Sequence, residues 1–196
     1  MSNKTKQEIM ESCIEMLETE KFSKISVKDI VKKCNINRKT FYYYFTDKYS
    51  LVTEYIASAL KKSMGLSEDF TEEKLLQVNW DVALKSILRF FYENKKLVQN
   101  IFTSLLHTDL EELLFKIIEP FGYYNICLNA KPFKVPDSEL KIIAGLISDV
   151  VASSILRWIK NGMMDDPIKI VDHHTKLLQR TIGVILENAE KLSGID

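Results

Sequence analysis

The chain has 196 residues, of which 46% are hydrophobic, and this is enough for one or two compact domains with apolar cores. We find no run of roughly 20 apolar residues, the length that a membrane-spanning helix needs, and no apolar signal segment follows Met1. We therefore expect a cytoplasmic protein without a transmembrane helix. Cys13, Cys34 and Cys127 lack C-x-x-C spacing, which favours reduced thiols over disulfides or metal ligands.

The formal net charge of zero hides an asymmetry along the chain. Residues 1–62 contain 12 Lys or Arg and 8 Asp or Glu, a balance of +4, and the totals of 27 and 27 leave 15 against 19 beyond them, a balance of −4. A basic end on an otherwise acidic chain favours contact with nucleic acid at that end. Solvated helix surfaces would account for an excess of this size as well, so charge supports this interpretation without deciding it.

Two short helices are expected after an amphipathic first helix over residues 5–18. Ser26 and Asp29 have the spacing of a capping box, and apolar residues follow at helical spacing. Asn35 tolerates the left-handed conformation that a tight turn needs, and Asn37 can cap a second helix from Arg38 to about residue 44. Two helices joined by such a turn predict a helix-turn-helix, whose second helix enters the major groove of DNA.

The second of these helices has one apolar face and one face suited to DNA. Phe41 and Phe45 are four residues apart and should pack inward. Arg, Lys, Thr and Tyr side chains supply most contacts to phosphates, and a smaller subset contacts base edges. The candidates are Arg38 and Lys39 for base edges, Tyr43 for a thymine methyl, and Lys28, Thr40, Tyr42 and Lys48 for phosphate oxygens.

The same aromatic residues, 40–45, also have a high propensity for β-strand. A strand would alternate apolar and polar residues and would need a neighbouring strand, and the sequence offers neither. We therefore expect a helix here.

Residues 6–60 resemble the DNA-binding domain of the TetR family of bacterial transcription regulators. The matching elements are residues 5–18, 22–30 and 37–48, and Lys39 departs from the Gly that many members carry there. The resemblance implies an all-α homodimer, with a three-helix helix-turn-helix domain over 1–48 joined by a helix over 47–64 to an all-helical regulatory and dimerisation domain over 65–196. It also implies a near-palindromic operator and a small-molecule effector bound by the second domain.

Within this family, residues 37–48 are similar to those of regulators of dihydroxyacetone-kinase operons. That narrower similarity implies activation of such an operon, with a coactivator protein sensing the metabolite. We take repression as the default mode and keep activation as the alternative.

Beyond residue 64 the pattern predicts helices throughout. We expect them over 71–92, 97–106, 108–119 with continuation to 129 after Pro120, 137–160 and 166–191, with a linker over 130–136 that contains two prolines. The starts of the last two helices are expected at Asp137-Ser138 and Asp166-Pro167.

The last two expected helices are apolar on more than one face. Such a helix must bury more than one face, and two of them from each of two chains can form a four-helix bundle. The residues predicted to lie in this dimer interface are Ile147, Val151, Ile155, Leu178, Ile182 and Ile185. Further apolar residues, among them Ile142, Leu146, Leu177 and Val184, lie outside this stripe. The alternative is that both helices are buried within one subunit.

The middle of the chain is rich in aromatic residues that could line an effector pocket. The candidates are Trp80, Phe91, Phe102, His107, Tyr124 and Trp158, although aromatic residues at helical spacing more often form a core. His173 and His174 are adjacent and point to different sides of a helix, which makes a poor metal pair. We expect no metal and no cofactor.

Catalytic motifs are absent from the sequence. There is no phosphate-binding loop, no H-E-x-x-H and no G-x-S-x-G, and the six glycines are scattered. We therefore expect a DNA-binding regulator and not an enzyme. A small all-α enzyme is the remote alternative, and an adapter role of the C-terminal half is compatible with DNA binding.

Overall fold

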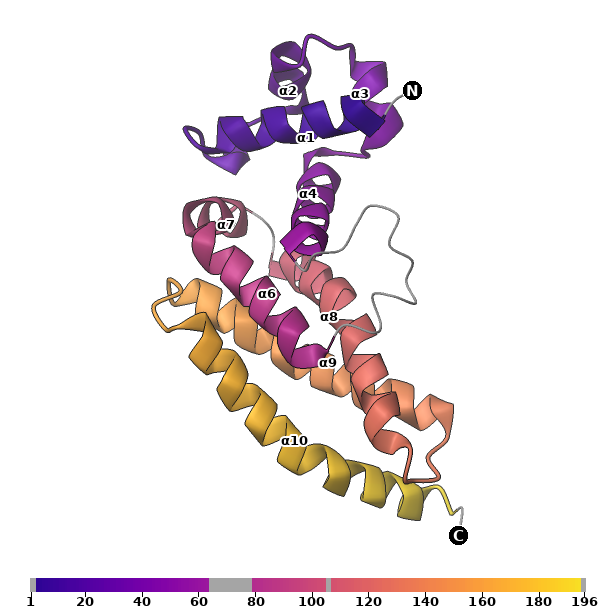
Figure 1. Cartoon of the computed structure of the whole chain (residues 1–196). Helices are drawn as coiled ribbons and strands as arrows, with labels where there is room; N and C mark the ends of the chain where they lie inside the picture. The colour runs from indigo at the N-terminus through magenta and orange to yellow at the C-terminus, as the bar shows by residue number, and fades with distance from the viewer. Residues whose placement is uncertain (1–2, 64–78, 105–106, 195–196) are drawn as a thin grey trace.

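The computed structural model describes residues 3–63, 79–104 and 107–194, and these ranges are helical without strands (Figure 1). The helices are α1 Asn3–Leu17, η1 Phe22–Lys24, α2 Val27–Lys33, α3 Arg38–Tyr44, α4 Lys48–Ser63, α6 Trp80–Glu93, α7 Lys95–Phe102, α8 His107–Ala130, α9 Asp137–Lys160 and α10 Pro167–Leu192. The predicted all-α fold is confirmed. The start of the helix expected over residues 71–92 lies outside the described residues.

The first three helices and the start of α4 enclose a small apolar core. Phe22, Ile30, Phe41 and Leu51 are completely buried in it, and Cys13 joins them from α1. Burial in this apolar core raises the pKa of the Cys13 thiol to about 12. The α4 helix then leads away from this unit to the second one and packs against α6 (Figure 1).

The C-terminal helices form a bundle in which α8 packs along α9, and α10 packs across α6 and α8 (Figure 1). The α8 helix continues through Pro120, where we expected an interruption. A proline inside a helix costs roughly 3 kcal/mol. The neighbouring Ile118 and Phe121 are buried in the core, so packing against the bundle offsets this cost.

The α9 helix is more apolar than we expected from the sequence. A window of 18 residues within it has a mean hydropathy of 1.7, so by length and composition alone it could cross a membrane. In the structure, 56% of that window is buried inside the protein. The physical reason for its composition is its central position in the bundle, where α8 covers one side.

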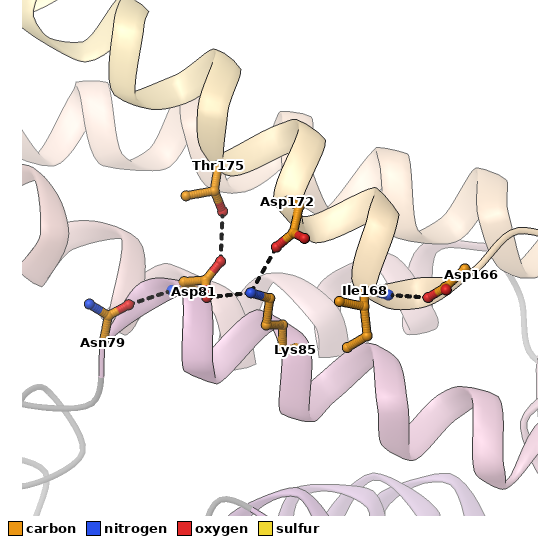
Figure 2. A network of polar contacts seen from close by, with 7 residues as sticks. All are labelled: Asn79, Asp81, Lys85, Asp166, Ile168, Asp172 and Thr175. Atoms are coloured by element: carbon orange, nitrogen blue, oxygen red, sulfur yellow. Dashed lines mark hydrogen bonds and ion pairs between the residues drawn. The ribbon is translucent and has the colours of Figure 1, made fainter.

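A network of polar side chains joins α6 to α10 (Figure 2). The Lys85 ammonium lies 2.7 Å from a carboxylate oxygen of Asp81 and 2.7 Å from one of Asp172, and the Thr175 hydroxyl donates to Asp81. The hydrogen bonds from Lys85 raise the pKa of its own ammonium and lower that of the Asp172 carboxyl. Asp166 caps α10 by accepting from the amide of Ile168, as predicted, whereas α9 has no side-chain cap and begins at Asp137.

Candidate nucleic-acid interface

The predicted capping box at the start of α2 is present. The Ser26 hydroxyl accepts from the amide of Asp29, and the Asp29 carboxylate accepts from the amide of Ser26 at 3.0 Å. The hydrogen bonds from Ser26 lower the pKa of the Asp29 carboxyl. The two residues fix where α2 starts, and Lys28 follows Ser26 on an exposed part of its first turn.

The turn between α2 and α3 is a Schellman motif. The amide of Asn35 donates to the carbonyl of Lys32, and the amide of Ile36 donates to the carbonyl of Val31. Asn35 has a φ of 52°, the left-handed conformation that the sequence predicted. This geometry ends α2 and sets the direction in which α3 leaves.

The N-terminus of α3 is capped by Asn37, as predicted. The Oδ1 atom of Asn37 accepts from the backbone amide of Thr40 at 2.8 Å and from the Thr40 hydroxyl at 3.1 Å. The hydroxyl hydrogen of Thr40 is therefore used inside the cap, and Thr40 is half-buried. Thr40 stabilises the start of the helix in this geometry, which the prediction of a phosphate contact did not anticipate.

The two faces of α3 are arranged as the sequence predicted. Phe41 and Phe45 point into the core, with their ring centres 5.7 Å apart. On the other side, Tyr42 is 55% exposed and Tyr43 is 68% exposed. Arg38 and Lys39, in the first turn, are exposed as well. A capped helix with arginine, lysine and tyrosine on its solvent face is suited to a DNA groove.

Lys48 is predicted to contact a phosphate oxygen, and in the structure its ammonium contacts backbone groups of the protein itself. Its Nζ atom donates to the carbonyl oxygens of Phe22 at 2.7 Å and of Ile25 at 2.8 Å. It also lies 4.6 Å from the ring centre of Phe22 and 5.4 Å from that of Tyr49. Desolvation lowers the pKa of this ammonium. Because two of its three hydrogens serve these carbonyls, Lys48 holds η1 against the start of α4 in this structure.

The residues predicted for the dimer interface lie on the inward side of α9 and α10. Ile147, Val151, Ile155 and Ile182 are buried within the subunit, and Leu178 and Ile185 are half-buried against its core. Four of the six predicted interface residues therefore lie in the core of the subunit, and Leu178 and Ile185 stay predictions for the interface. The reason is that α8 and α6 cover this stripe, which supplies the core of the bundle instead.

The outward side of the same two helices is also apolar. We call it the α9–α10 face, and define it as Ile142, Leu146, Val150, Leu177 and Val184, which are 52–66% exposed. A groove of about 470 Å³ runs along it, and Ser154, Arg157 and His174 are among its lining residues. The sequence had indicated a second apolar face but not which of the two is exposed.

The sequence of the chain matches two known protein families. A family of bacterial regulatory proteins, the tetR family, matches residues 9–55, and a family described as the C-terminal region of transcriptional regulators (TetR type) matches residues 78–180. The chain belongs to the TetR family. The family is one of DNA-binding transcriptional regulators that are not enzymes.

Two helix-turn-helix transcriptional regulators share sequence with this chain. It is 38% identical over 55 residues to the transcriptional regulator EthR of Mycolicibacterium smegmatis, which is 28% of this chain and 25% of EthR. It is 27% identical over 133 residues to the probable transcriptional regulator YttP of Bacillus subtilis, which is 60% of this chain and 64% of YttP. The match therefore spans less than two thirds of either relative.

Two solved structures have the same fold. The dihydroxyacetone kinase operon activator DhaS matches with a TM-score of 0.66 and 21% identity, covering 93% of this chain and 98% of DhaS. The Thermus thermophilus repressor FadR, solved with lauroyl-CoA, matches with a TM-score of 0.61 and 18% identity, covering 89% of this chain and 93% of FadR. At these identities the similarity establishes the fold.

The aromatic residues proposed to line an effector pocket in this TetR chain lie largely in the core. Trp80, Phe91 and Trp158 are buried, and Trp158 donates its indole N–H to the carbonyl of Asp165. Phe102 and Tyr124 are half-buried. The side chain of His107 lies outside the described residues.

Of these residues, only Trp80 lines the small cavity between α6, α8, α9 and α10. The cavity has a volume of about 20 Å³, and the other lining residues include Gly122, Asn125, Thr175 and Gln179. A volume of this size holds about one water molecule. Beside it, the buried Ser148 hydroxyl has no hydrogen-bond partner among the described residues, and a Cβ on Gly122 would lie 2.7 Å from it.

Proposed function

We propose that the chain acts as a homodimeric, cytoplasmic regulator that binds a near-palindromic operator through α3. The observation that carries this proposal is the division of α3 into a buried phenylalanine side and an exposed side with Arg38, Lys39, Tyr42 and Tyr43. This arrangement supports insertion of the solvent side of α3 into the major groove.

We assign different roles to the exposed residues. Arg38 and Lys39 lie at the N-terminal end of α3, which in helix-turn-helix proteins contacts base edges, so we propose them as the residues that read sequence. Tyr43 is the candidate for apolar contact with a thymine methyl. Tyr42 and Lys28 are the proposed phosphate contacts, and Thr40 and Lys48 support this surface from behind.

We further propose that the α9–α10 face binds the same face of a second copy. Isolated exposed apolar side chains are common, but a continuous face on two helices of one bundle favours association. An isologous pair would present two α3 helices to DNA, at a spacing of about 34 Å or a multiple of it. This proposed interface lies on the other side of α9 from Ile147, Val151 and Ile155, which the sequence predicted to lie between subunits.

An effector is the third element of the proposal. FadR was solved in complex with lauroyl-CoA, and a ligand of that size would require the helices around the cavity of about 20 Å³ to move apart in this chain. Buried Ser148 and the amides of Asn125 and Gln179 offer polar groups at this position. The alternative is that this chain activates a dihydroxyacetone kinase operon, the role that the name of DhaS gives for that protein. In that case we propose that a coactivator protein senses the metabolite in place of a ligand of this chain.

A gel-shift titration with the DNA upstream of the chain's own gene tests the proposal. Specific binding should weaken steeply with salt, because the logarithm of the binding constant falls by about 0.9 per neutralised phosphate for each logarithmic unit of salt. Competition by unrelated duplex as effective as by the upstream DNA would contradict sequence-specific binding.

A further inference from the structure

The Asn100 side chain on α7 joins the C-terminal bundle to the N-terminal unit. Its Nδ2 atom donates to the carbonyl oxygens of Leu17 at 3.0 Å and of Glu20 at 2.7 Å, and its Oδ1 atom accepts from the amide of Phe22 at 2.9 Å. These partners lie about 80 positions earlier in the chain. The α7 helix lies beside the C-terminal end of α1 in space (Figure 1).

These three backbone groups have no other hydrogen-bond partner in the part of the chain that the structure describes. Leu17 is the last residue of α1, and the last carbonyls of a helix have no partner within that helix. Glu20 lies in the turn that follows, and Phe22 is the first residue of η1. One amide side chain from another part of the protein therefore caps α1 and fixes the start of η1, using both donor hydrogens and its acceptor.

Phe22 contacts both Asn100 and Lys48, and Lys48 lies just after α3 in the chain. Its amide is held by Asn100, and its carbonyl oxygen accepts from Lys48 at 2.7 Å. Lys48 is the first residue of α4 and follows three positions after Phe45, which is the C-cap of α3. A shift of Asn100 would therefore displace Phe22 and, through Lys48, the end of α3.

The other side of α7 lies near the turn between α9 and α10. Val98 and Ile101 anchor α7 in the core of the bundle. A Cβ on Gly162, in the turn between α9 and α10, would lie 3.9 Å from Nε2 of Gln99. The side chain of Gln99 thus lies near the turn between the two proposed dimer helices, and the next residue, Asn100, contacts the N-terminal unit.

We propose that Asn100 is the positioning residue through which the C-terminal bundle sets the placement of α3. This role rests on the proposed function, since it concerns control of DNA binding by the second domain. Linkage requires reciprocity: if the bundle positions α3 through Asn100, DNA bound by α3 must in turn stabilise α7.

Hydrogen exchange of the full-length protein, with and without the upstream duplex, tests this role. Asn100→Ala removes all three hydrogen bonds, and Asn100→Asp keeps the acceptor for Phe22 but loses the donors to Leu17 and Glu20. Lys96→Ala, an exposed position on the same helix, is the matched control.

In free protein, we expect the Phe22 amide to exchange about tenfold faster in Asn100→Ala, which is the effect of losing a hydrogen bond, and to stay close to wild type in Lys96→Ala. In Asn100→Asp the second carboxylate oxygen would face the carbonyls of Leu17 and Glu20, so this amide should also exchange faster than in wild type. Adding the duplex should slow exchange in α7 of the wild type and of Lys96→Ala. In Asn100→Ala the duplex should protect α3 and leave α7 unchanged.

Two results would overturn the role of Asn100. One is an unchanged Phe22 amide in Asn100→Ala, and the other is equal protection of α7 by DNA in Asn100→Ala and wild type. A wild-type protein that gives no gel shift would instead refute the proposed function, and the Phe22 measurement would still decide whether Asn100 caps α1.

Discussion

The ammonium of Lys48 lies 2.7 Å from the carbonyl oxygen of Phe22 and 4.6 Å from the centre of the ring of the same residue. A second carbonyl, that of Ile25, accepts from the same ammonium at 2.8 Å. The first residue of α4 thus binds the carbonyl and the ring of Phe22, which begins η1, and the carbonyl of Ile25, which follows it. The position of α3 depends on this contact, because Lys48 follows α3 by only a few residues.

Replacing Lys48 with Met should destabilise the N-terminal unit. Methionine keeps the length of the side chain but loses both hydrogen bonds, and a hydrogen bond to a charged group contributes about 1.5–3 kcal/mol. We expect the free energy of unfolding, measured by urea titration, to fall by an amount in this range. Lys39→Met, at an exposed position, should change it by less than about 0.5 kcal/mol. Equal effects of the two substitutions would mean that the Lys48 contacts contribute nothing.

Leu146→Glu should turn the dimer into a monomer. Leu146 is 62% exposed at the middle of the α9–α10 face, where a second copy would bury a new, unpaired carboxylate. Sedimentation velocity should show a dimer for the wild type and a monomer for the variant, with unchanged helical content by circular dichroism. Leu128→Glu, 42% exposed on α8, is the control and should remain dimeric. A dimeric Leu146→Glu protein would remove this face from the interface.

Acidification should destabilise the protein through His174. This imidazole lies 3.2 Å from the Ser154 hydroxyl, and burial, with a smaller effect of His173, lowers its pKa below the ordinary 6.5. Asp149 and Arg157 line the same groove. Because the folded state binds the proton less tightly than the unfolded state does, stability is lost as the pH falls from about 6.5 through the lowered value.

Replacement of the histidine isolates this effect. The free energy of unfolding of His174→Gln should depend less on pH than that of the wild type between pH 7 and the lowered pKa, whereas His173→Gln, at an exposed position, should follow the wild type closely. Parallel curves for all three proteins would show that His174 does not account for the acid sensitivity.

Gly122 and Ser148 should behave as a coupled pair. Gly122→Ala places a methyl group 2.7 Å from the Ser148 hydroxyl, and such overpacking costs about 1–3 kcal/mol. Ser148→Ala removes a buried hydroxyl without a partner among the described residues, so it should leave stability unchanged or raise it. Thermal melting of the double variant should recover most of the loss of Gly122→Ala. A purely additive result would mean that the two positions do not touch.

Sequence patterns predicted α3 well because the information there is local. Caps at Ser26 and Asn37 fix where each short helix starts, and the four-residue spacing of Phe41 and Phe45 fixes its inward side. The acceptors of Lys48 lie 23 and 26 residues earlier, so no local pattern could place its ammonium.

Four of the predicted dimer residues lie in the core of the subunit, which the sequence could not show because α9 has apolar residues on both of its sides. Leu146 is exposed and its neighbour Ile147 is buried, yet both have the spacing of an apolar stripe. Which stripe faces inward depends on where α8 crosses, and this is a property of the packed bundle. The contacts of Asn100 could not be predicted from the sequence either, because its partners are backbone groups about 80 residues away.

Arg38 provides the most direct test of the central claim that α3 reads base sequence. The measurement is the ratio of affinities for the upstream operator duplex and for a scrambled duplex, by fluorescence anisotropy at one salt concentration, for wild type, Arg38→Ala and the remote control Lys169→Ala. We expect Arg38→Ala to lower this ratio by a factor that corresponds to about 1–3 kcal/mol of binding free energy, and Lys169→Ala to leave it unchanged. An unchanged ratio in Arg38→Ala, or an equal loss of affinity for both duplexes, would contradict base reading by Arg38.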